Sequence, residues 1–424
     1  MVPRHPCLSV PPEHRLVLLT AAGPWADDAI RACLADGVRW PVVFQAARGY
    51  AATSEVWRRL ERIGEEAVDV PVSGGSASVS GWPPDPDVAA AFRRTARIMD
   101  FRMSVLQERL DAILERLDAE GLPVVLLKGA ATGLQRFGGL HRRPMGDVDL
   151  LLAPEDARVA HVLARDMGWN LPPAASGLRP HMYEGLHHHI PLVPADGLGF
   201  ALEIHHDLFP EWGPFGLTGE AVMARARPLE PAASGAPLVP APEDHLLHTC
   251  LHFAWSHSFR FGAWRTFRDL DGLLDDPQLD LEVFCRRTLD AKGATCVFWV
   301  LTVFGHLMGR PLPHGIQEAL GVRPGGLRRR VLLRHLGAEA VRSHSGSGVQ
   351  RLRRILWTLA VDPVGSGHGS SRPWAGDDRW PGPTREALTR PEHQPSNLGQ
   401  RTLGLLGYLG FLAGGLIRDG GGVR

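Results

Sequence analysis

The chain has 424 residues, of which 44% are hydrophobic and 22% are charged, and its formal net charge at pH 7 is zero. These values are typical of a soluble globular protein of two or three domains, and they argue against a disordered chain or a global polycation that binds nucleic acid. The five cysteines form no C-x-x-C pair and the N-terminus has no continuous apolar segment, so we expect a reduced, cytoplasmic protein without a signal peptide.

The first part of the chain is predicted to be helical. Residues 15–64 hold apolar residues at helical spacing, and residues 66–86 are rich in Gly, Ser and Pro, as in a linker. From Asp87 to Glu120 the pattern predicts one long amphipathic helix with an apolar stripe, and Asp87 suits its N-cap. We therefore assign residues 1–86 to an N-terminal helical region with a linker.

A strand, a tight turn and a helix are predicted next. The apolar segment Val124–Leu127 has the length and branching of a buried strand, Lys128 and Gly129 interrupt it, and residues 130–137 suit a helix. Only two of the 46 basic residues are lysines, and Lys128 is one of them. One interpretation is that a planar guanidinium cannot replace the compact ammonium group of a lysine that remains, although chance placement of so few lysines is the alternative.

Two acidic residues open the following strand, after a loop that contains Arg142 and Arg143. Asp147 and Asp149 form a D-x-D pair, and residues two apart in a strand point to the same face. The two carboxylates are therefore expected to lie side by side and to need a cation between them. In an arginine-rich protein, both arginines fit plain loop positions.

A third carboxylate is predicted to join this pair. Strands are expected at residues 187–194 and 200–208, and the period of two places Glu203, His205 and Asp207 on one face. If the second of these strands lies antiparallel beside the D-x-D strand, Glu203 completes a three-carboxylate cluster that suits Mg2+. His205 is then a candidate to orient a carboxylate or the substrate.

These segments resemble a known family. The stretches LLKGAA, RRPMGDVDLLL and LEIHHDL are similar to the uncharacterised nucleotidyltransferase family of the DNA polymerase beta nucleotidyltransferase superfamily. The resemblance implies an α+β fold in which a polymerase-beta-like core, a small mixed sheet with helices, is flanked by N-terminal and C-terminal helical regions. It implies that Asp147, Asp149 and Glu203 are the catalytic metal ligands. Gly129 matches the turn glycine, whereas Ala130 stands where many members have serine.

The implied activity is Mg2+-dependent transfer of a nucleoside monophosphate from a nucleoside triphosphate, such as ATP, to an acceptor hydroxyl. Two Mg2+ ions, with Mn2+ as a substitute, are expected on the three carboxylates, and Glu203 is also the expected base. The triphosphate is expected to meet four residues near a helix N-terminus: Lys128, Gly129, Arg142 and Arg143. The acceptor is left open among a metabolite, a protein and an RNA.

Two other functions stay open at this point. A non-catalytic nucleotide-binding or scaffold protein would keep the same fold, and Ala130 makes this credible because a hydroxyl donor to phosphate is missing. A metal-dependent hydrolase is suggested by two groups of histidines. Around the predicted strand pair lie His187, His188, His189, His205 and His206, and on a predicted helix lie His245, His248, His252 and His257. His248 and His252 are four residues apart, as zinc ligands often are. The chain has no H-E-x-x-H pattern, however, and buried structural histidines are the commoner case.

The rest of the chain is expected to follow a nucleotidyltransferase core at residues 87–240. We assign residues 241–340 to a helical bundle and residues 341–424 to an irregular tail with a C-terminal apolar helix. Arg268 and Asp269, in the bundle, match a family position and are candidates for a buried ion pair.

Two further segments carry expectations about partners. The arginine-rich stretch 323–354 is more simply a solvated helix face than a strip that contacts RNA. The uncharged segment 402–417 is shorter than the roughly 20 apolar residues of a membrane span, so no transmembrane helix is expected. Docking on the protein or on a partner helix is the default, and association with a membrane surface is the alternative.

Overall fold

The structure is a computed structural model that describes most of the chain. The described residues are 10–68, 82, 84–171, 189–197, 200–209, 213–230, 235–260, 262–341, 350–361 and 409. The chain divides into two compact units, one of residues 11–253 and 261–293 and one of residues 1–10, 254–260 and 294–424. The first unit combines helices with a mixed sheet, which confirms the predicted α+β class. The polymerase-beta-like identity of its core and the four-region division stay predictions.

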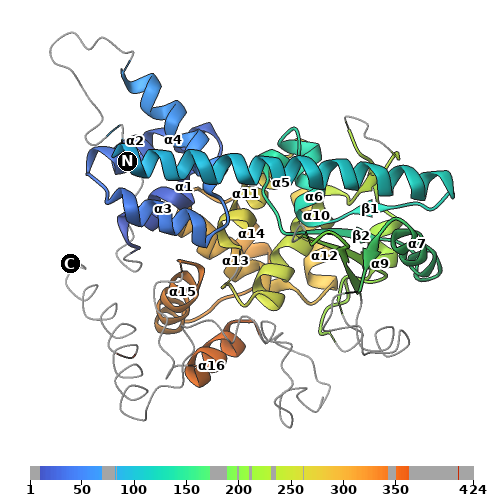
Figure 1. Ribbon diagram of the computed structural model, residues 1–424. Coiled ribbons are helices and arrows are strands. Elements are labelled where there is room, and N and C mark those ends of the chain that lie inside the picture. Colours follow the sequence, from blue (N-terminus) through green and yellow to red (C-terminus); the bar gives the residue numbers. More distant parts are fainter. Residues whose placement is uncertain are drawn as a thin grey trace. The chain divides into compact units, whose positions relative to one another are not determined.

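Five α-helices precede the sheet, and the last is the longest. They are α1 Pro12–Leu19, α2 Asp27–Ala35, α3 Trp40–Gly49, α4 Thr53–Val68 and α5 Pro86–Ala119. Figure 1 shows α5 extending from the N-terminal helices to the sheet. The long helix is thus confirmed, but its N-cap is Asp85 and not Asp87: the Asp85 carboxylate accepts the N–H of Asp87 at 2.8 Å. The reason is Pro86, which suits the first helical position and places the cap one residue before it.

The expected linker falls mostly on residues that the structure does not describe. Helix α4 continues to Val68, so the first residues of the predicted linker are helical. Of the rest, residues 69–81 and 83 lie outside the described part of the chain.

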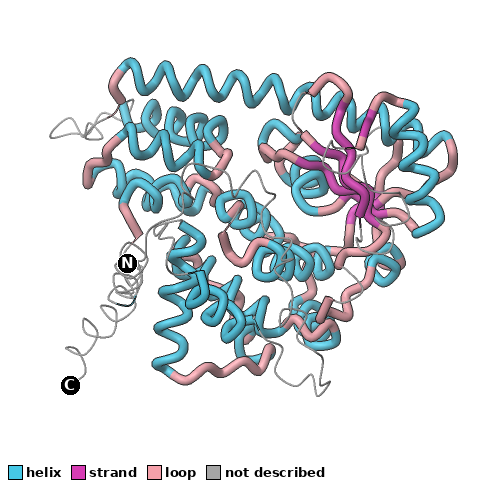
Figure 2. Tube along the Cα trace, turned by 60° about the horizontal axis from the view of Figure 1, so that its bottom comes forward, coloured by secondary structure: helices cyan, strands magenta, loops and turns pink. Residues whose placement is uncertain are grey.

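The described strands form one mixed sheet with the order β3-β4-β5-β2-β1-β7-β6. They are β1 Val125–Leu126, β2 Asp147–Leu151, β3 Trp169–Asn170, β4 His189–Pro194, β5 Ala201–His205, β6 Arg227–Pro228 and β7 Leu238–Val239. The described residues between these strands include the α-helices α6 Lys128–Arg136, α7 Pro154–Asp166 and α9 Gly219–Met223. Figure 2 shows the strands in magenta, gathered together with helices beside them.

The direction of β5 differs from the expectation. It lies beside β2 in parallel and not antiparallel orientation, with Asp149 opposite Glu203. The reason is the connection, because α7, β3 and β4 intervene and the antiparallel pairs β3–β4 and β4–β5 turn the chain back to the direction of β2. The three acidic positions nevertheless share one face of the sheet, since residues opposite each other in a ladder share a face in either orientation.

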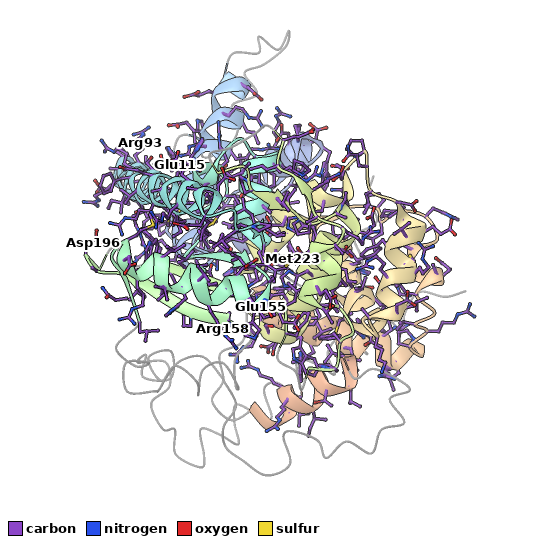
Figure 3. The ribbon with its side chains drawn as sticks, turned by 90° about the vertical axis from the view of Figure 1, so that its right-hand side faces the viewer. Arg93, Glu115, Glu155, Arg158, Asp196 and Met223 are labelled. Atoms are coloured by element: carbon purple, nitrogen blue, oxygen red, sulfur yellow. The ribbon has the colours of Figure 1, made fainter. Side chains whose placement is uncertain are left out.

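One face of the sheet is buried against helices. Val148 and Leu150 of β2 and Leu202 and Ile204 of β5 belong to one apolar cluster that includes the predicted stripe of α5. Each such side chain contributes roughly 1.5–3 kcal/mol when fully buried, so this face fixes the register of β2 and β5. The exposed sides of α5 and α7 carry charged side chains, among them Arg93, Glu115, Glu155 and Arg158, which Figure 3 labels.

Three further helices complete the first unit, and four form the described part of the second. The former are α10 Pro242–Leu251, α11 Ala263–Leu274 and α12 Leu281–Asp290; the latter are α13 Ala294–Met308, α14 Ile316–Ala319, α15 Gly326–Val341 and α16 Gln350–Val361. No helix in the described ranges combines the length and the apolar character that crossing a membrane requires. The segment 402–417 lies, except for Leu409, outside the described residues.

The arginine-rich stretch is only partly a solvated face. Arg328, Arg329 and Arg330 on α15 are exposed, as expected. Arg353 on α16 is instead buried, and its Nε lies 2.9 Å from a carboxylate oxygen of Glu339. Arg260 contacts the same carboxylate at 3.1 Å. The single acid of this stretch therefore pairs with two arginines inside the second unit.

Candidate active site

Acidic side chains gather on the face of the central strands that does not hold the apolar core. Asp149 and Glu203 are opposite each other in the β2–β5 ladder, and Asp147 lies two residues before Asp149 on the same face. Asp149 is 3% exposed, whereas Asp147, at the start of β2, is exposed. The three acidic positions therefore share one face of the ladder, as predicted. The Asp149 side chain is buried on this face, and the Asp147 side chain is exposed to solvent.

Lys128 supplies the cation beside these acids. It lies two residues after the end of β1, begins α6, and has a positive φ of 49°, which is uncommon for a residue other than glycine. Its Nζ donates to Asp149 Oδ1 at 2.6 Å. Burial lowers the pKa of Lys128, but the charges of Asp149, Glu203 and Asp147 outweigh burial and raise it. The side chain is thus a stable ammonium group within the acidic cluster.

The Asp149 carboxylate is held ionised by two partners. Burial alone would raise its pKa, but the Lys128 ammonium and the hydrogen bond with His205 outweigh burial and hold the pKa well below its usual range. His205 Nε2 lies 2.9 Å from Asp149 Oδ1. Asp149 is therefore an anion held in a fixed position, as is needed for a group that stabilises charge in a reaction.

His205 connects the two carboxylates, as its predicted orienting role requires. Its Nε2 also lies 3.5 Å from Glu203 Oε2, and its Nδ1 lies 3.3 Å from the carbonyl oxygen of Asp207. Burial lowers the pKa of His205, but its hydrogen bonds with Asp149 and Glu203 outweigh burial and raise it. The two carboxylates therefore favour a positive charge at the His205 ring.

The sequence pointed to His189 only as one of the histidines around the predicted strand pair, and not as a member of the acidic site. It is opposite His205 in the antiparallel β4–β5 ladder, and the two rings stack with centroids 4.8 Å apart. Its Nε2 lies 3.8 Å from Glu203 Oε2. Burial, followed by the charge of His205, lowers the pKa of His189 to about 4. The register of the predicted hairpin could have indicated this contact, because it places His189 opposite His205 across the turn after β4.

The predicted phosphate-binding arginines differ sharply in their surroundings. Arg142 is exposed, whereas Arg143 is 7% exposed and donates to both oxygens of Asp269, from Nε at 2.8 Å and from Nη2 at 2.5 Å. Thr132 donates to the same carboxylate at 2.7 Å. Arg143 therefore ties the loop before β2 to α11 and is not directed to solvent.

These contacts also explain why position 129 is glycine, and the explanation differs from the expected one. A Cβ atom at this position would lie 2.8 Å from Arg143 Cζ. Glycine is thus required because the guanidinium packs against the turn, whereas the sequence had suggested the approach of a phosphate.

The predicted pair of Arg268 with Asp269 is wrong. Asp269 is taken by Arg143, and Arg268 Nη2 instead lies 3.3 Å from Glu55 Oε2. The Arg268 guanidinium also lies over the ring of Phe137, 4.3 Å from its centroid. Successive residues of a helix point in different directions, so neighbours in sequence reach different partners.

His248, on α10, and His252, which follows the last residue of α10, belong to no group of three close metal-ligating side chains in the described residues. His248 and His252 have ring centroids 5.9 Å apart and an interplanar angle of 69°. In the described part of the chain, the one group of three side chains with suitably close ligand atoms is His189, Glu203 and His205. Burial lowers the pKa of His248 well below its usual value, so its ring is neutral.

Comparison with known proteins gives one match. A family described as an uncharacterised nucleotidyltransferase matches residues 38–309, which is more than half of the chain and includes all strands of the described sheet. No match was found among curated proteins or among solved structures.

Proposed function

Since the chain belongs to the uncharacterised nucleotidyltransferase family, we propose that it transfers a nucleoside monophosphate from a nucleoside triphosphate such as ATP to an acceptor hydroxyl. In this reaction the acceptor oxygen bonds to the α-phosphorus, the bond to pyrophosphate breaks, and the hydroxyl proton passes to a base. The observation that carries the proposal is the pairing of Asp149 with Glu203 across β2 and β5, beside Asp147 and the Lys128 ammonium.

The donor set at this edge fits Mg2+, with Mn2+ as a substitute. Asp147, Asp149 and Glu203 offer carboxylate oxygens, the ligands that hard divalent cations prefer. Their three negative charges face the single charge of Lys128, which leaves the cluster short of positive charge. Bound there, the ions would polarise the α-phosphoryl group and stabilise the leaving pyrophosphate.

The residues of the chain would contribute positioning and proton transfer. Glu203, partly exposed at 22% of its side chain, is the proposed base, and His205 at 3.5 Å holds it in orientation. Lys128 and the first backbone N–H groups of α6 lie beside the acids, and helix N-termini leave such groups without intrahelical partners. Exposed Arg142 is the proposed contact for the triphosphate, whereas the contacts of Arg143 favour a role in holding the turn at Gly129.

A non-catalytic nucleotide-binding or scaffold protein is the second candidate. The observation that favours it is the 2.6 Å contact of Lys128 Nζ with Asp149 Oδ1, because the ammonium engages an oxygen that a catalytic ion would need. Buried Ala130 points the same way, since it offers no hydroxyl group to a phosphate. Both proposals place nucleotide at this edge of the sheet, and they differ in turnover.

The experiment follows the fate of the α-phosphate. Purified protein is incubated with each of the four α-labelled nucleoside triphosphates, Mg2+ or Mn2+, and cell extract separated into small-molecule, RNA and protein fractions. We expect label transfer to one fraction and equal release of pyrophosphate. Asp149→Asn should abolish both, and Asp166→Asn, at an exposed site on α7, should change neither. Binding of nucleotide without pyrophosphate release would instead support the scaffold, and water as the only acceptor would support the hydrolase.

A further inference from the structure

Two imidazole rings and a carboxylate converge next to the acidic pair. His189 and His205 are directly opposite in the β4–β5 ladder, and Glu203 precedes His205 by two residues on the same strand. All three side chains therefore project from one face of the sheet. One nitrogen or oxygen atom from each lies within 4.8 Å of the other two.

The distances within this group are close to those of a metal site. Glu203 Oε2 lies 3.5 Å from His205 Nε2 and 3.8 Å from His189 Nε2. An ion bonded to nitrogen and oxygen at roughly 2.0–2.2 Å holds its ligand atoms roughly 3–4 Å apart. Small side-chain rotations would thus bring the three atoms onto one ion, without a change in the strands that carry them.

The surroundings of His205 point to a cation at its Nε2. Its Nδ1 lies 3.3 Å from the carbonyl oxygen of Asp207, which can only accept a hydrogen bond. Nδ1 therefore carries the proton, and Nε2 faces the oxygens of Asp149 and Glu203. A bare nitrogen lone pair directed at two carboxylates is unfavourable, so either a proton or a metal ion must lie there. A hydrogen bond from Nδ1 to a carbonyl group is also the usual orienting contact of a metal-bound histidine.

We propose that His189, Glu203 and His205 bind one first-row transition-metal ion, such as Zn2+ or Co2+, in preference to Mg2+. Imidazole nitrogen is a good ligand for zinc, copper, iron and nickel, whereas Mg2+ prefers oxygen and keeps several waters. Two imidazoles with one carboxylate leave coordination positions open, as in catalytic rather than structural sites. The proposal rests on the proposed function and refines it: the ion on Glu203 is a transition metal, and Mg2+ is left to the Asp147 and Asp149 carboxylates.

The test measures metal binding to the full-length protein without nucleotide. Chelator-treated protein is titrated with Co2+ and followed by its visible absorption, which reports nitrogen and oxygen ligands around the ion. We expect one equivalent to bind, Zn2+ to displace it, and Mg2+ in roughly hundredfold excess to leave the spectrum unchanged. His189→Asn should lower the Co2+ affinity at least about tenfold, with circular dichroism as a check that the protein is folded.

A matched histidine controls for adventitious binding. His206 follows His205 directly but is not one of the three clustered residues, so His206→Asn should bind Co2+ as the unmodified protein does. Displacement of Co2+ by Mg2+ at a comparable concentration, or full affinity in folded His189→Asn, would overturn the proposal. The Co2+ titration contains no nucleotide, so its result is independent of the label-transfer assay described above. Co2+ binding without label transfer in that assay would contradict the proposed function alone. Label transfer with Mg2+ in a protein that does not bind Co2+ would contradict this inference alone.

Discussion

The Nζ atom of Lys128 lies 2.6 Å from Oδ1 of Asp149, and the side chains are 17% and 4% exposed. The contact joins the turn after β1 to the second acid of the D-x-D pair. It depends on the left-handed backbone of Lys128, a conformation that non-glycine residues keep where the surrounding structure enforces it and often at functional sites. The lysine thus has two roles to test, one in stability and one in nucleotide binding.

Lys128→Met should destabilise the protein by about 3–5 kcal/mol, because it leaves the Asp149 carboxylate buried without its main counterion. Chemical unfolding in urea at pH 7.5 measures the change. The chain supplies its own control, since Lys292 is the one other lysine, is exposed and also has a positive φ. Lys292→Met should stay within about 0.5 kcal/mol of the unmodified protein. Equal losses in the two variants would refute a special role for the ammonium at position 128.

Gly129→Ala should cost about 1–3 kcal/mol through overpacking. The added methyl group would meet the Arg143 guanidinium, which cannot move aside because both oxygens of Asp269 hold it. Gly146→Ala is the control, since a Cβ there has no atom within 4 Å. Thermal unfolding of both variants measures the difference. If the Gly129→Ala protein were as stable as the Gly146→Ala protein, the Arg143 guanidinium would have to move aside for the added methyl group, contrary to this prediction.

The sequence predicted those features of the site that depend on local periodicity. The period of two placed Asp147 with Asp149 and Glu203 with His205, and the apolar pattern located α5 and both strands. Local patterns do not report strand direction, which here depends on the connection through α7, β3 and β4. They also do not report partners that are far apart in the chain. Arg143 and Asp269 are separated by 126 residues, so only the packing of α11 against α6 brings them together.

The two adjacent arginines should separate stability from nucleotide binding. Arg143→Ala leaves Asp269 buried with one hydroxyl partner and should destabilise the protein by about 3–5 kcal/mol. Exposed Arg142→Ala should leave the unfolding midpoint unchanged but weaken triphosphate binding severalfold, because a charge-assisted contact is lost. Fluorescence titration with a labelled triphosphate measures the second effect. Unchanged affinity in Arg142→Ala would remove this residue from the proposed site.

Acid should destabilise the protein partly through His245 on α10. Burial lowers the pKa of His245 to about 4, and its Nε2 lies 3.3 Å from the carbonyl oxygen of Lys128. The unfolded chain, with a histidine pKa of about 6.5, binds the proton more readily, so this stability is complete above about pH 6.5 and is lost as the pH falls toward 4. The slope approaches about 1.4 kcal/mol per pH unit.

His245→Gln keeps a donor for the Lys128 carbonyl group but cannot bind a proton, so its urea midpoint should fall less between pH 7 and pH 5 than that of the unmodified protein. The exposed residue His314 provides the comparison, and His314→Gln should follow the unmodified protein at every pH. Parallel acid losses in His245→Gln and the unmodified protein would mean that the buried ring is already protonated when folded. A protonated His245 ring would then donate to the carbonyl oxygen of Lys128, the first residue of α6. The charges around the turn beside Asp149 would in that case include a second cation next to the Lys128 ammonium.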